Sequence, residues 1–259
     1  MEWNPADYAA NSASQQSWAE ELISRLRLQG DESILDVGCG DGKVSAALAR
    51  MVPAGRVLGI DISPTMIHFA RSTLERHANL EFELMDARRI RTSRRFDIVF
   101  SNAALHWVDD HPAFLAGVAE ILRSGGRLMV SCGGRGNAHD VFLAVRAVMR
   151  RKRWQQCFRN LEKPYFFYSP EEYRQWLPRL GFDSKSVELV NKVTMFSDAL
   201  KFAGWLRTTW LPYTQRVPLA EREEFIENVV QRYLARHPTD TDGRVHVKMV
   251  RLEIDAVRV

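Results

Sequence analysis

Cysteine is scarce in this chain of 259 residues, which contains only Cys39, Cys132 and Cys157. Because their number is odd and their spacing wide, the sequence offers neither the paired framework of a disulfide-stabilised domain nor the close pairs of a zinc site. We expect three free thiols.

Long apolar runs are lacking as well. No stretch approaches the ~20 apolar residues that a membrane-spanning helix needs. The first residues also lack the basic segment and apolar run of a secretion signal. We therefore expect a cytoplasmic protein that does not associate with a membrane.

A strong excess of one charge is missing too, since 36 Lys and Arg stand against 32 Asp and Glu, a formal net charge of +4. Basic residues cluster at 88–91, 94–95 and 150–153, but no aromatic stacking motif is interleaved in the first two clusters. We interpret these clusters as solvated surface and expect no nucleic-acid partner.

The sequence also contains no convincing set of metal ligands. His106 and His111 lie close to Asp109 and Asp110, but the four residues straddle a predicted strand-to-helix loop without metal-ligand spacing. We expect no bound metal.

What the sequence does have is a regular alternation of strand and helix patterns. With 46% hydrophobic and 26% charged residues, the chain can bury a substantial core and fits one enlarged domain. The alternation predicts an α/β fold with a mostly parallel sheet, whose site lies at the carboxyl edge of the strands. Strands are expected around 34–37, 59–61, 80–85, 96–101, 127–131, 185–196 and 245–257.

Local signals place the helices between these strands. The first begins at Gln15 or Gln16, and a helix after the first strand is expected to bury Val44, Ala47, Leu48 and Met51. Other helices are expected after Ser63-Pro64, at 112–122, at about 137–158, after Ser169-Pro170, after Ser197 as an N-cap and after Pro218.

The stretch from Ile34 to Lys43 is the most informative. It reads as a strand, a tight turn and the start of a helix, with Gly38, Gly40 and Gly42 at every second position. A dinucleotide-binding turn has the spacing G-x-G-x-x-G, which does not match. Asp36 precedes the glycines and can accept a hydrogen bond from an ammonium group, so we expect a cationic nucleotide-like cofactor, S-adenosylmethionine.

Three further landmarks follow in order: Asp61 at the end of the second strand, Asp86 after the third, and the fourth strand up to Asn102. Together with the glycine turn, they resemble the class I S-adenosylmethionine-dependent methyltransferases. The resemblance implies that Asp61 holds both ribose hydroxyls and that Asp86 binds adenine. It implies a cofactor-binding set of Asp36, Gly38, Cys39, Gly40, Asp61, Ile62, Met66, Asp86, Ala87 and Asn102.

The same resemblance implies a Rossmann-like, seven-stranded sheet closed by a C-terminal antiparallel hairpin, with helical lid insertions. The core is then expected at about 17–134, 182–196 and 243–259, and the lid at about 135–181 and 197–242.

Asp86 has a second interpretation, as a helix cap.

The segments Trp3 to Tyr8, Asn102 to Trp107 and Trp205 to Leu211 resemble the trans-aconitate methyltransferases, and part of this pattern also resembles the juvenile hormone acid methyltransferases. Both families make carboxyl methyl esters. The resemblance implies that Gln15, or Gln16 in another register, and Trp107 donate hydrogen bonds to a substrate carboxylate.

A lid residue is also expected to grip the carboxylate. Arg207, between two tryptophans, is favoured over Tyr165, Tyr213 and Arg135, because a guanidinium forms paired hydrogen bonds with a carboxylate. His106 is either a general base or a packed structural residue. Trp107 is alternatively only a residue of the hydrophobic core. The aromatic run 165–168 is interpreted as packing within the lid.

The leading hypothesis is therefore a methyltransferase that acts on the carboxyl group of a small molecule, as a monomer or homodimer. One alternative is methylation of a neutral oxygen, nitrogen or carbon with His106 as the base. Another is a partner subunit that binds the cofactor without catalysis.

Overall fold

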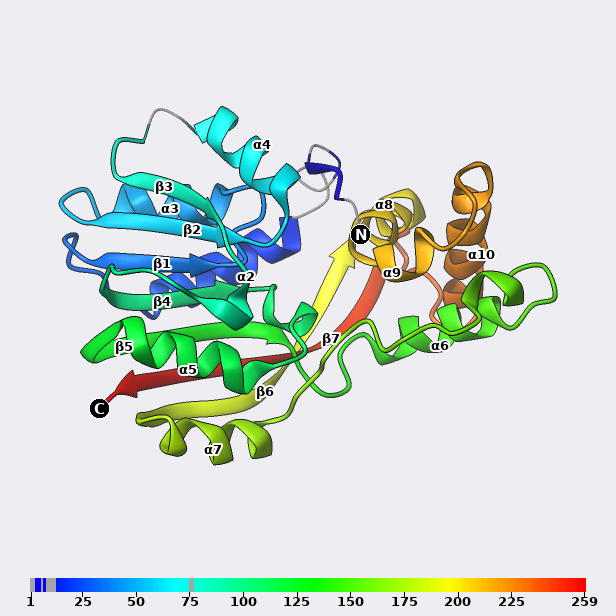
Figure 1. Cartoon of the computed structure of the whole chain (residues 1–259). Helices are drawn as coiled ribbons and strands as arrows, with labels where there is room; N and C mark the ends of the chain where they lie inside the picture. Colours follow the sequence, from blue (N-terminus) through cyan, green and yellow to red (C-terminus); the bar gives the residue numbers. More distant parts are fainter. Residues whose placement is uncertain (1–2, 6, 8–12, 75–76) are drawn as a thin grey trace. The chain divides into compact units, whose positions relative to one another are not determined.

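The computed structural model describes residues 3–5, 7, 13–74 and 77–259. Within these residues one sheet has the strand order β3-β2-β1-β4-β5-β7-β6 (Figure 1). The strands are β1 (Ser33–Val37), β2 (Arg56–Asp61), β3 (Leu80–Leu84), β4 (Phe96–Asn102), β5 (Leu122–Gly133), β6 (Phe182–Phe196) and β7 (Val245–Arg258). The first five pair in parallel, and β7 is antiparallel to β5. The predicted α/β fold with a closing antiparallel segment is confirmed.

Helices follow the strands in the order expected from the sequence pattern. They are α2 (Ala13–Ser24), α3 (Lys43–Met51), α4 (Pro64–Leu74), α5 (His111–Ile121), α6 (His139–Met149), α7 (Pro170–Arg179), α8 (Ala199–Thr209), α9 (Leu211–Thr214) and α10 (Arg222–Leu234). Short 3-10 turns lie at η1 (Ala87–Arg89), η2 (Leu105–Trp107), η3 (Gln155–Phe158) and η4 (Leu219–Glu221).

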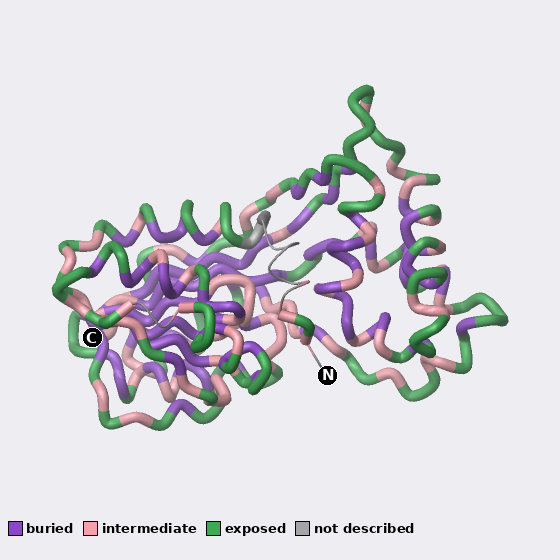
Figure 2. The backbone as a smooth tube through the Cα atoms, turned by 90° about the horizontal axis from the view of Figure 1, so that it is seen from above, coloured by how far each residue is buried: buried purple, intermediate pink, exposed green. Residues whose placement is uncertain are grey.

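Successive residues of β1 face opposite sides of the sheet, as the two-residue period of a strand requires. Ile34 packs with α2 and α3, in a cluster that includes Leu22 and Leu48. Leu35 belongs to the cluster on the other face, which α5 and α7 cover. The central strands are therefore buried on both sides, which Figure 2 shows as purple segments.

The chain forms two compact units. Unit 1 comprises residues 1–12, 136–164 and 191–250, and unit 2 comprises residues 13–135, 165–190 and 251–259. Residues 165–181, which the sequence assigned to the lid, belong to unit 2. The reason is that Tyr173 and Leu177 of α7 are fully buried in the same cluster as Phe114 of α5.

Unit 1 is built mainly from α6, α8 and α10. Aromatic side chains join these helices: the ring centroids of Phe202 and Tyr233 are 5.0 Å apart, and those of Phe142 and Trp210 are 4.5 Å apart. The predicted apolar stripe of α10 is buried at Phe225, Ile226 and Val229.

Several local predictions need correction. Asp198, not Ser197, caps α8, because its carboxylate accepts a hydrogen bond from the N–H of Lys201. The helix expected at 137–158 ends at Met149 and resumes only as η3. Pro218 precedes η4, and α10 starts later, at Arg222.

The buried face of α3 also differs from the prediction. The sequence pattern favoured Val44, Ala47, Leu48 and Met51, whereas the buried residues are Ser45, Ala46, Leu48 and Ala49. Ser45 faces inward, where its hydroxyl binds the carboxylate of Asp36 in β1, and Val44 is partly buried against the cluster that contains Leu48. A polar residue thus faces inward and Met51 is exposed.

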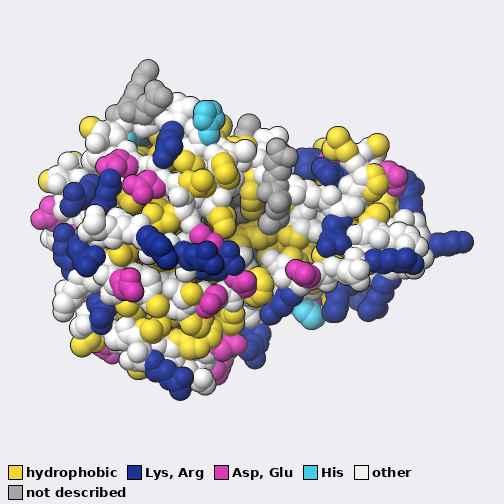
Figure 3. Space-filling model, viewed as in Figure 1, with side chains coloured by type: hydrophobic (Ala, Val, Ile, Leu, Met, Phe, Trp, Pro, Cys, Tyr) yellow, Lys and Arg dark blue, Asp and Glu magenta, His cyan; other side chains and the backbone are white. Residues whose placement is uncertain are grey.

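All three cysteines are free, as expected; Cys39 and Cys132 are buried. In the part of the chain that is described, no helix combines the length and apolar character needed to span a bilayer. The basic residues Arg88, Arg89 and 150–153 are exposed, and Figure 3 shows Lys and Arg side chains on the surface.

Candidate active site

The predicted cofactor residues lie at one edge of the sheet, where the neighbouring parallel strands β3, β2, β1 and β4 end. Asp36, Gly38, Cys39 and Gly40 are at the end of β1; Asp61 and Ile62 at the end of β2, with Met66 in the first turn of α4; Asp86 and Ala87 after β3; and Asn102 at the end of β4. Since parallel strands present their carboxyl ends at the same edge, the structure brings this set together.

The turn after β1 requires glycine for two reasons. Gly38, Gly40 and Gly42 have φ angles of 77°, 55° and 81°, in the left-handed region that glycine occupies without strain. In addition, a Cβ on Gly38 would lie 2.1 Å from the Cβ of Ala104. Side chains at this turn would therefore push away the segment that follows β4.

Three successive backbone N–H groups of this turn already have acceptors within the fold. Those of Gly38 and Cys39 both donate to the carbonyl of Ile60, at 2.7 and 3.0 Å, and that of Gly40 donates to the carboxylate of Asp61 at 3.0 Å. A phosphate-binding turn directs such groups at the ligand instead. This turn is thus unsuited to a pyrophosphate.

Carboxylates surround the turn. Asp36 is 2% exposed, and burial, with the negative charges of Asp61 and Asp41, raises its pKa to about 7 although the hydroxyl of Ser45 donates to it at 2.6 Å. Burial also raises the pKa of Asp61. Lys43 forms an ion pair with Asp41 at 3.3 Å. A positively charged ligand would relieve the repulsion between these groups.

The side chain of Asp61 is held in one orientation. One of its oxygens accepts from Gly40, and the other accepts from the N–H of Ser63 at 2.8 Å. The next residue, Ile62, is 62% exposed, whereas Met66 is buried in α4. An exposed apolar side chain beside a fixed carboxylate suits a ligand with a flat apolar ring and hydroxyl groups.

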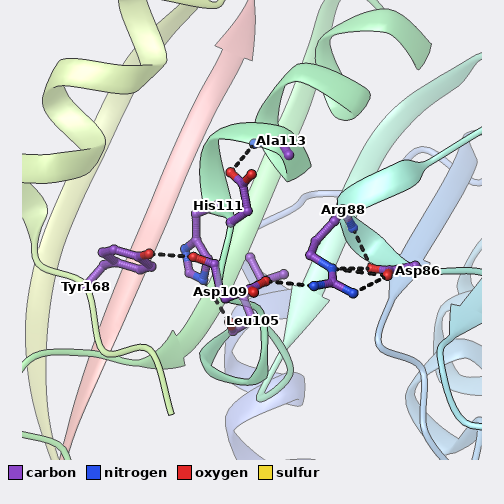
Figure 4. Close-up of polar contacts among 8 residues, drawn as sticks. Asp86, Arg88, Leu105, Asp109, His111, Ala113 and Tyr168 are labelled. Atoms are coloured by element: carbon purple, nitrogen blue, oxygen red, sulfur yellow. Dashed lines mark hydrogen bonds and ion pairs between the residues drawn. The ribbon is translucent and has the colours of Figure 1, made fainter. Parts of the chain in front are cut away.

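Asp86 is the N-cap of η1, so its interpretation as a cap is correct. It accepts from the N–H of Arg88 at 2.9 Å and from the guanidinium of Arg88 at 2.7–3.1 Å, which lowers its pKa. Arg88 also binds Asp109 at 3.0 Å and so bridges the segments after β3 and β4 (Figure 4).

The segment after β4 turns sharply into η2, which carries His106 and Trp107. His111, which is fully buried, fixes this turn: its Nε2 lies 2.7 Å from the carbonyl of Leu105, and its Nδ1 lies 2.7 Å from the hydroxyl of Tyr173. A carbonyl only accepts, so Nε2 carries the proton and Tyr173 donates to Nδ1. Burial lowers the pKa of His111 to about 4, which keeps the ring neutral.

His106 is also held neutral. Burial first, and then the positive charge of Arg251, lower its pKa to about 3. Its Nδ1 accepts a hydrogen bond from the N–H of Gly133 at 3.4 Å. A ring in this state has little capacity to take up a proton near neutral pH. The geometry therefore favours the structural interpretation of His106 over the general base.

The aromatic run 165–168 packs against η2 and belongs to the same unit. The N–H of Phe166 donates to the carbonyl of His106 at 2.9 Å, and the ring centroids of Tyr165 and Trp107 are 4.7 Å apart. The hydroxyl of Tyr168 donates to the carbonyl of Asp109 at 2.7 Å (Figure 4). Trp107 is only partly buried, so part of its side chain is accessible.

The four predicted catalytic residues are divided between the two units. His106 and Trp107 are neighbours in unit 2, with ring centroids 5.6 Å apart. Arg207 belongs to unit 1, where its guanidinium binds Glu223 at 2.8 Å and lies 3.8 Å from Asp7. Gln15 lies in α2, but its side chain is outside the described residues.

Comparison with known proteins agrees with this geometry. Residues 34–126 match the family described as "Methyltransferase domain". The chain is 30% identical over 259 residues to an uncharacterized methyltransferase of Schizosaccharomyces pombe, covering 98% of this chain and 97% of the relative. The chain belongs to the class I S-adenosylmethionine-dependent methyltransferases.

Two further similarities accompany this methyltransferase assignment. Trans-aconitate 2-methyltransferase of Escherichia coli O7:K1 is 29% identical, covering 99% of this chain and 98% of that protein. The geranyl diphosphate C-methyltransferase of Streptomyces coelicolor, solved with Mg²⁺, geranyl diphosphate and S-adenosyl-L-homocysteine, has a TM-score of 0.54 at 17% identity, covering 95% of this chain and 81% of that one. The latter similarity concerns the fold alone.

The methyltransferase cofactor fits the residues present. S-adenosylmethionine has a sulfonium and an ammonium group but no phosphate, and this chain offers buried carboxylates together with a glycine turn whose N–H groups are used. A dinucleotide would instead bring phosphates to buried carboxylates and to N–H groups that already have acceptors. Among the described residues, no group of three His, Cys, Asp or Glu side chains is arranged to hold a metal.

Sequence reasoning singled out neither Ser45 nor Tyr173, although Ser45 binds Asp36 and Tyr173 binds His111. Arg251 also escaped notice. Its signal was a basic residue at an inward position of an alternating strand, after the buried Val247 and Met249.

Proposed function

We propose that this methyltransferase transfers the methyl group of S-adenosylmethionine to the carboxylate of a small organic acid and so forms a methyl ester. The observation that carries the proposal is the engagement of His106, whose Nδ1 accepts from the N–H of Gly133 and whose pKa is lowered by its surroundings. A carboxylate is already ionised near neutral pH and needs no base, whereas an alcohol or amine must lose a proton.

The neighbouring carboxylates are engaged in structure, which also supports an acceptor that needs no base. Asp109 binds Arg88, and Asp110 caps α5 by accepting from the N–H of Ala113 at 2.9 Å. The roles left to the protein are then to hold the acceptor in line with the donor and to exclude water.

For the donor, we assign Asp36 to its ammonium group, Asp61 to its ribose hydroxyls and Asp86 to adenine. The donor supplies an electrophilic methyl carbon. Around it we place the backbone of Gly38, Cys39 and Gly40 and the side chains or backbone of Ile62, Met66, Ala87 and Asn102.

For the acceptor, we assign Trp107 and Gln15 as hydrogen-bond donors to the carboxylate, with His106 beside them as a neutral ring. To bind the acceptor, Arg207 would have to give up its ion pairs with Glu223 and Asp7. A relative with full-length similarity is named for trans-aconitate, itself a carboxylic acid, which supports this class of acceptor. We place the reaction in the cytoplasm, carried out by a monomer or homodimer.

The experiment is to incubate the protein with methyl-labelled S-adenosylmethionine and a panel of mono-, di- and tricarboxylic acids that includes trans-aconitate. Mild alkali then separates the product classes, because an ester releases its label as methanol. Label that resists alkali would indicate methylation at a neutral oxygen, nitrogen or carbon and would contradict the proposal.

A further inference from the structure

Arg251 of β7 is a charged residue in the interior of unit 2. It is 2% exposed, its guanidinium donates to the hydroxyl and carbonyl of Ser131 at 3.3 and 2.8 Å, and it lies 4.7 Å from the ring centroid of Trp18. Trp18 belongs to α2, one turn after Gln15. A buried guanidinium is costly to desolvate, which makes Arg251 a candidate for a role beyond packing.

The residues around Arg251 contact the segment that forms the acceptor turn, which carries His106 and Trp107. The carbonyl of Ser131 that it binds also accepts from the N–H of Ala103, at 2.7 Å. Ala103 has a φ of 57°, an uncommon conformation that starts the turn toward His106. The residue paired with Arg251 across β5 and β7 is Gly133, whose N–H binds the His106 ring.

The positive charge of Arg251 acts on His106 in this turn. The positive charge that disfavours a proton on His106 favours an anion in the same place, by the same Coulomb interaction.

We propose that Arg251 determines the charge specificity of the enzyme: its guanidinium, fixed by Ser131 and Trp18 beneath the turn that carries His106 and Trp107, stabilises an anionic acceptor. This rests on the proposed carboxyl methylation and adds the residue that selects the carboxylate. Because the guanidinium is buried, solvent screens its field far less than that of a surface arginine.

The test uses Arg251→Met and Arg251→Gln, which both remove the charge; glutamine keeps a hydrogen-bonding group for Ser131. The acid with the highest kcat/KM in the panel is the probe. We expect KM for that acid to rise at least about tenfold, as for the loss of a charge from a desolvated site. The affinity for S-adenosylhomocysteine and kcat should stay within about twofold of the wild-type values. A raised KM with these values unchanged indicates that acceptor binding is lost.

Arg123→Met is the matched control, because Arg123 is an exposed arginine of β5 that pairs with Asp97. It should leave every constant unchanged. An unchanged KM in a charge-removing variant that still binds S-adenosylhomocysteine would overturn the role of Arg251 alone. Alkali-stable product from the wild-type enzyme would instead overturn the carboxyl chemistry.

A second measurement on the wild-type protein keeps the proposal testable even if both variants fail to fold. The ¹⁵N resonance of the Arg251 Nε–H, assigned by its loss in Arg251→Lys, is followed in the presence of S-adenosylhomocysteine. Titration with the acid should shift this resonance, and titration with its primary amide should not. No shift with the acid would refute the proposal.

Discussion

The hydroxyl of Ser45 lies 2.6 Å from the carboxylate of Asp36 and joins the start of α3 to the end of β1. Both side chains are buried, and the pKa of Asp36 is raised to about 7. The carboxyl group is therefore partly protonated in the free protein at neutral pH, and a nearby ammonium group would favour its ionised form.

This relationship predicts a pH-dependent donor affinity. If the ammonium group of the donor binds Asp36, binding releases a proton below about pH 7, and affinity rises toward about pH 7 and levels off above it. Calorimetry with S-adenosylhomocysteine in two buffers of different ionisation enthalpy measures the release. Asp36→Asn should abolish it and weaken binding, whereas a pH-independent affinity of the wild type would refute the assignment.

The same pKa predicts an effect on the stability of the free protein. A carboxyl group whose pKa is higher in the folded state stabilises the fold when protonated, and this contribution is lost as pH rises through about 7. Asp36→Asn should therefore raise Tm more at pH 8 than at pH 5. An equal change at both values would contradict the raised pKa.

Asp61→Ala should weaken S-adenosylhomocysteine binding by about 1–3 kcal/mol, because the ribose hydroxyls would lose their acceptor. The measurement is a calorimetric titration. Asp183→Ala is the matched control, since Asp183 is an exposed residue of β6 that pairs with Lys185. Equal affinities for the wild type and Asp61→Ala would remove Asp61 from the ribose site.

Much of the fold was predictable because buried parallel strands and their connecting helices leave strong periodic patterns. The turn at Gly38, Gly40 and Gly42 was equally legible, since only glycine adopts its φ angles without strain. The end of each strand, and thus the position of Asp61, followed from these patterns.

The rest depends on contacts between residues far apart in the sequence. Periodicity gave no reason to place Ser45 inward, but its hydroxyl donates to the buried carboxylate of Asp36. Arg207 attracted attention because of its sequence neighbours, yet its partner is Glu223, which lies 16 residues further on. The alternation of β7 marked Arg251 as inward, but its partner Ser131 lies 120 residues away and is brought near only by the pairing of β7 with β5.

Trp107→Phe should lower kcat about tenfold and leave S-adenosylhomocysteine affinity unchanged, because it removes one hydrogen-bond donor to the acceptor and keeps an aromatic ring. Steady-state kinetics with the best acid of the panel, together with calorimetry, provides the check. Trp154→Phe, at a buried tryptophan of unit 1 that packs on Phe225, is the control. A wild-type kcat for Trp107→Phe would exclude Trp107 from the acceptor site.

Tyr173→Phe should lower both stability and turnover. It leaves Nδ1 of His111 without its donor and so loosens the turn that His111 holds at Leu105. We expect a loss of about 1–2 kcal/mol in urea denaturation and a reduced kcat at unchanged S-adenosylhomocysteine affinity.

Tyr233→Phe separates these two effects. The hydroxyl of Tyr233 donates to the carbonyl of His246 at 2.7 Å in unit 1, so this variant loses a similar hydrogen bond away from the acceptor turn. Its stability should fall by a comparable amount while its kcat stays unchanged. An equal loss of kcat in both variants would mean that Tyr173 acts only through global stability.

The most direct test of base-free carboxyl methylation is the pH dependence of kcat at saturating donor and acid. We expect a level profile from about pH 5.5 to 8.5, because the acceptor is ionised throughout and His106 stays neutral. A kcat that rises about tenfold per pH unit to a plateau, and loses that dependence in His106→Asn, would show that His106 is a base and would contradict the account.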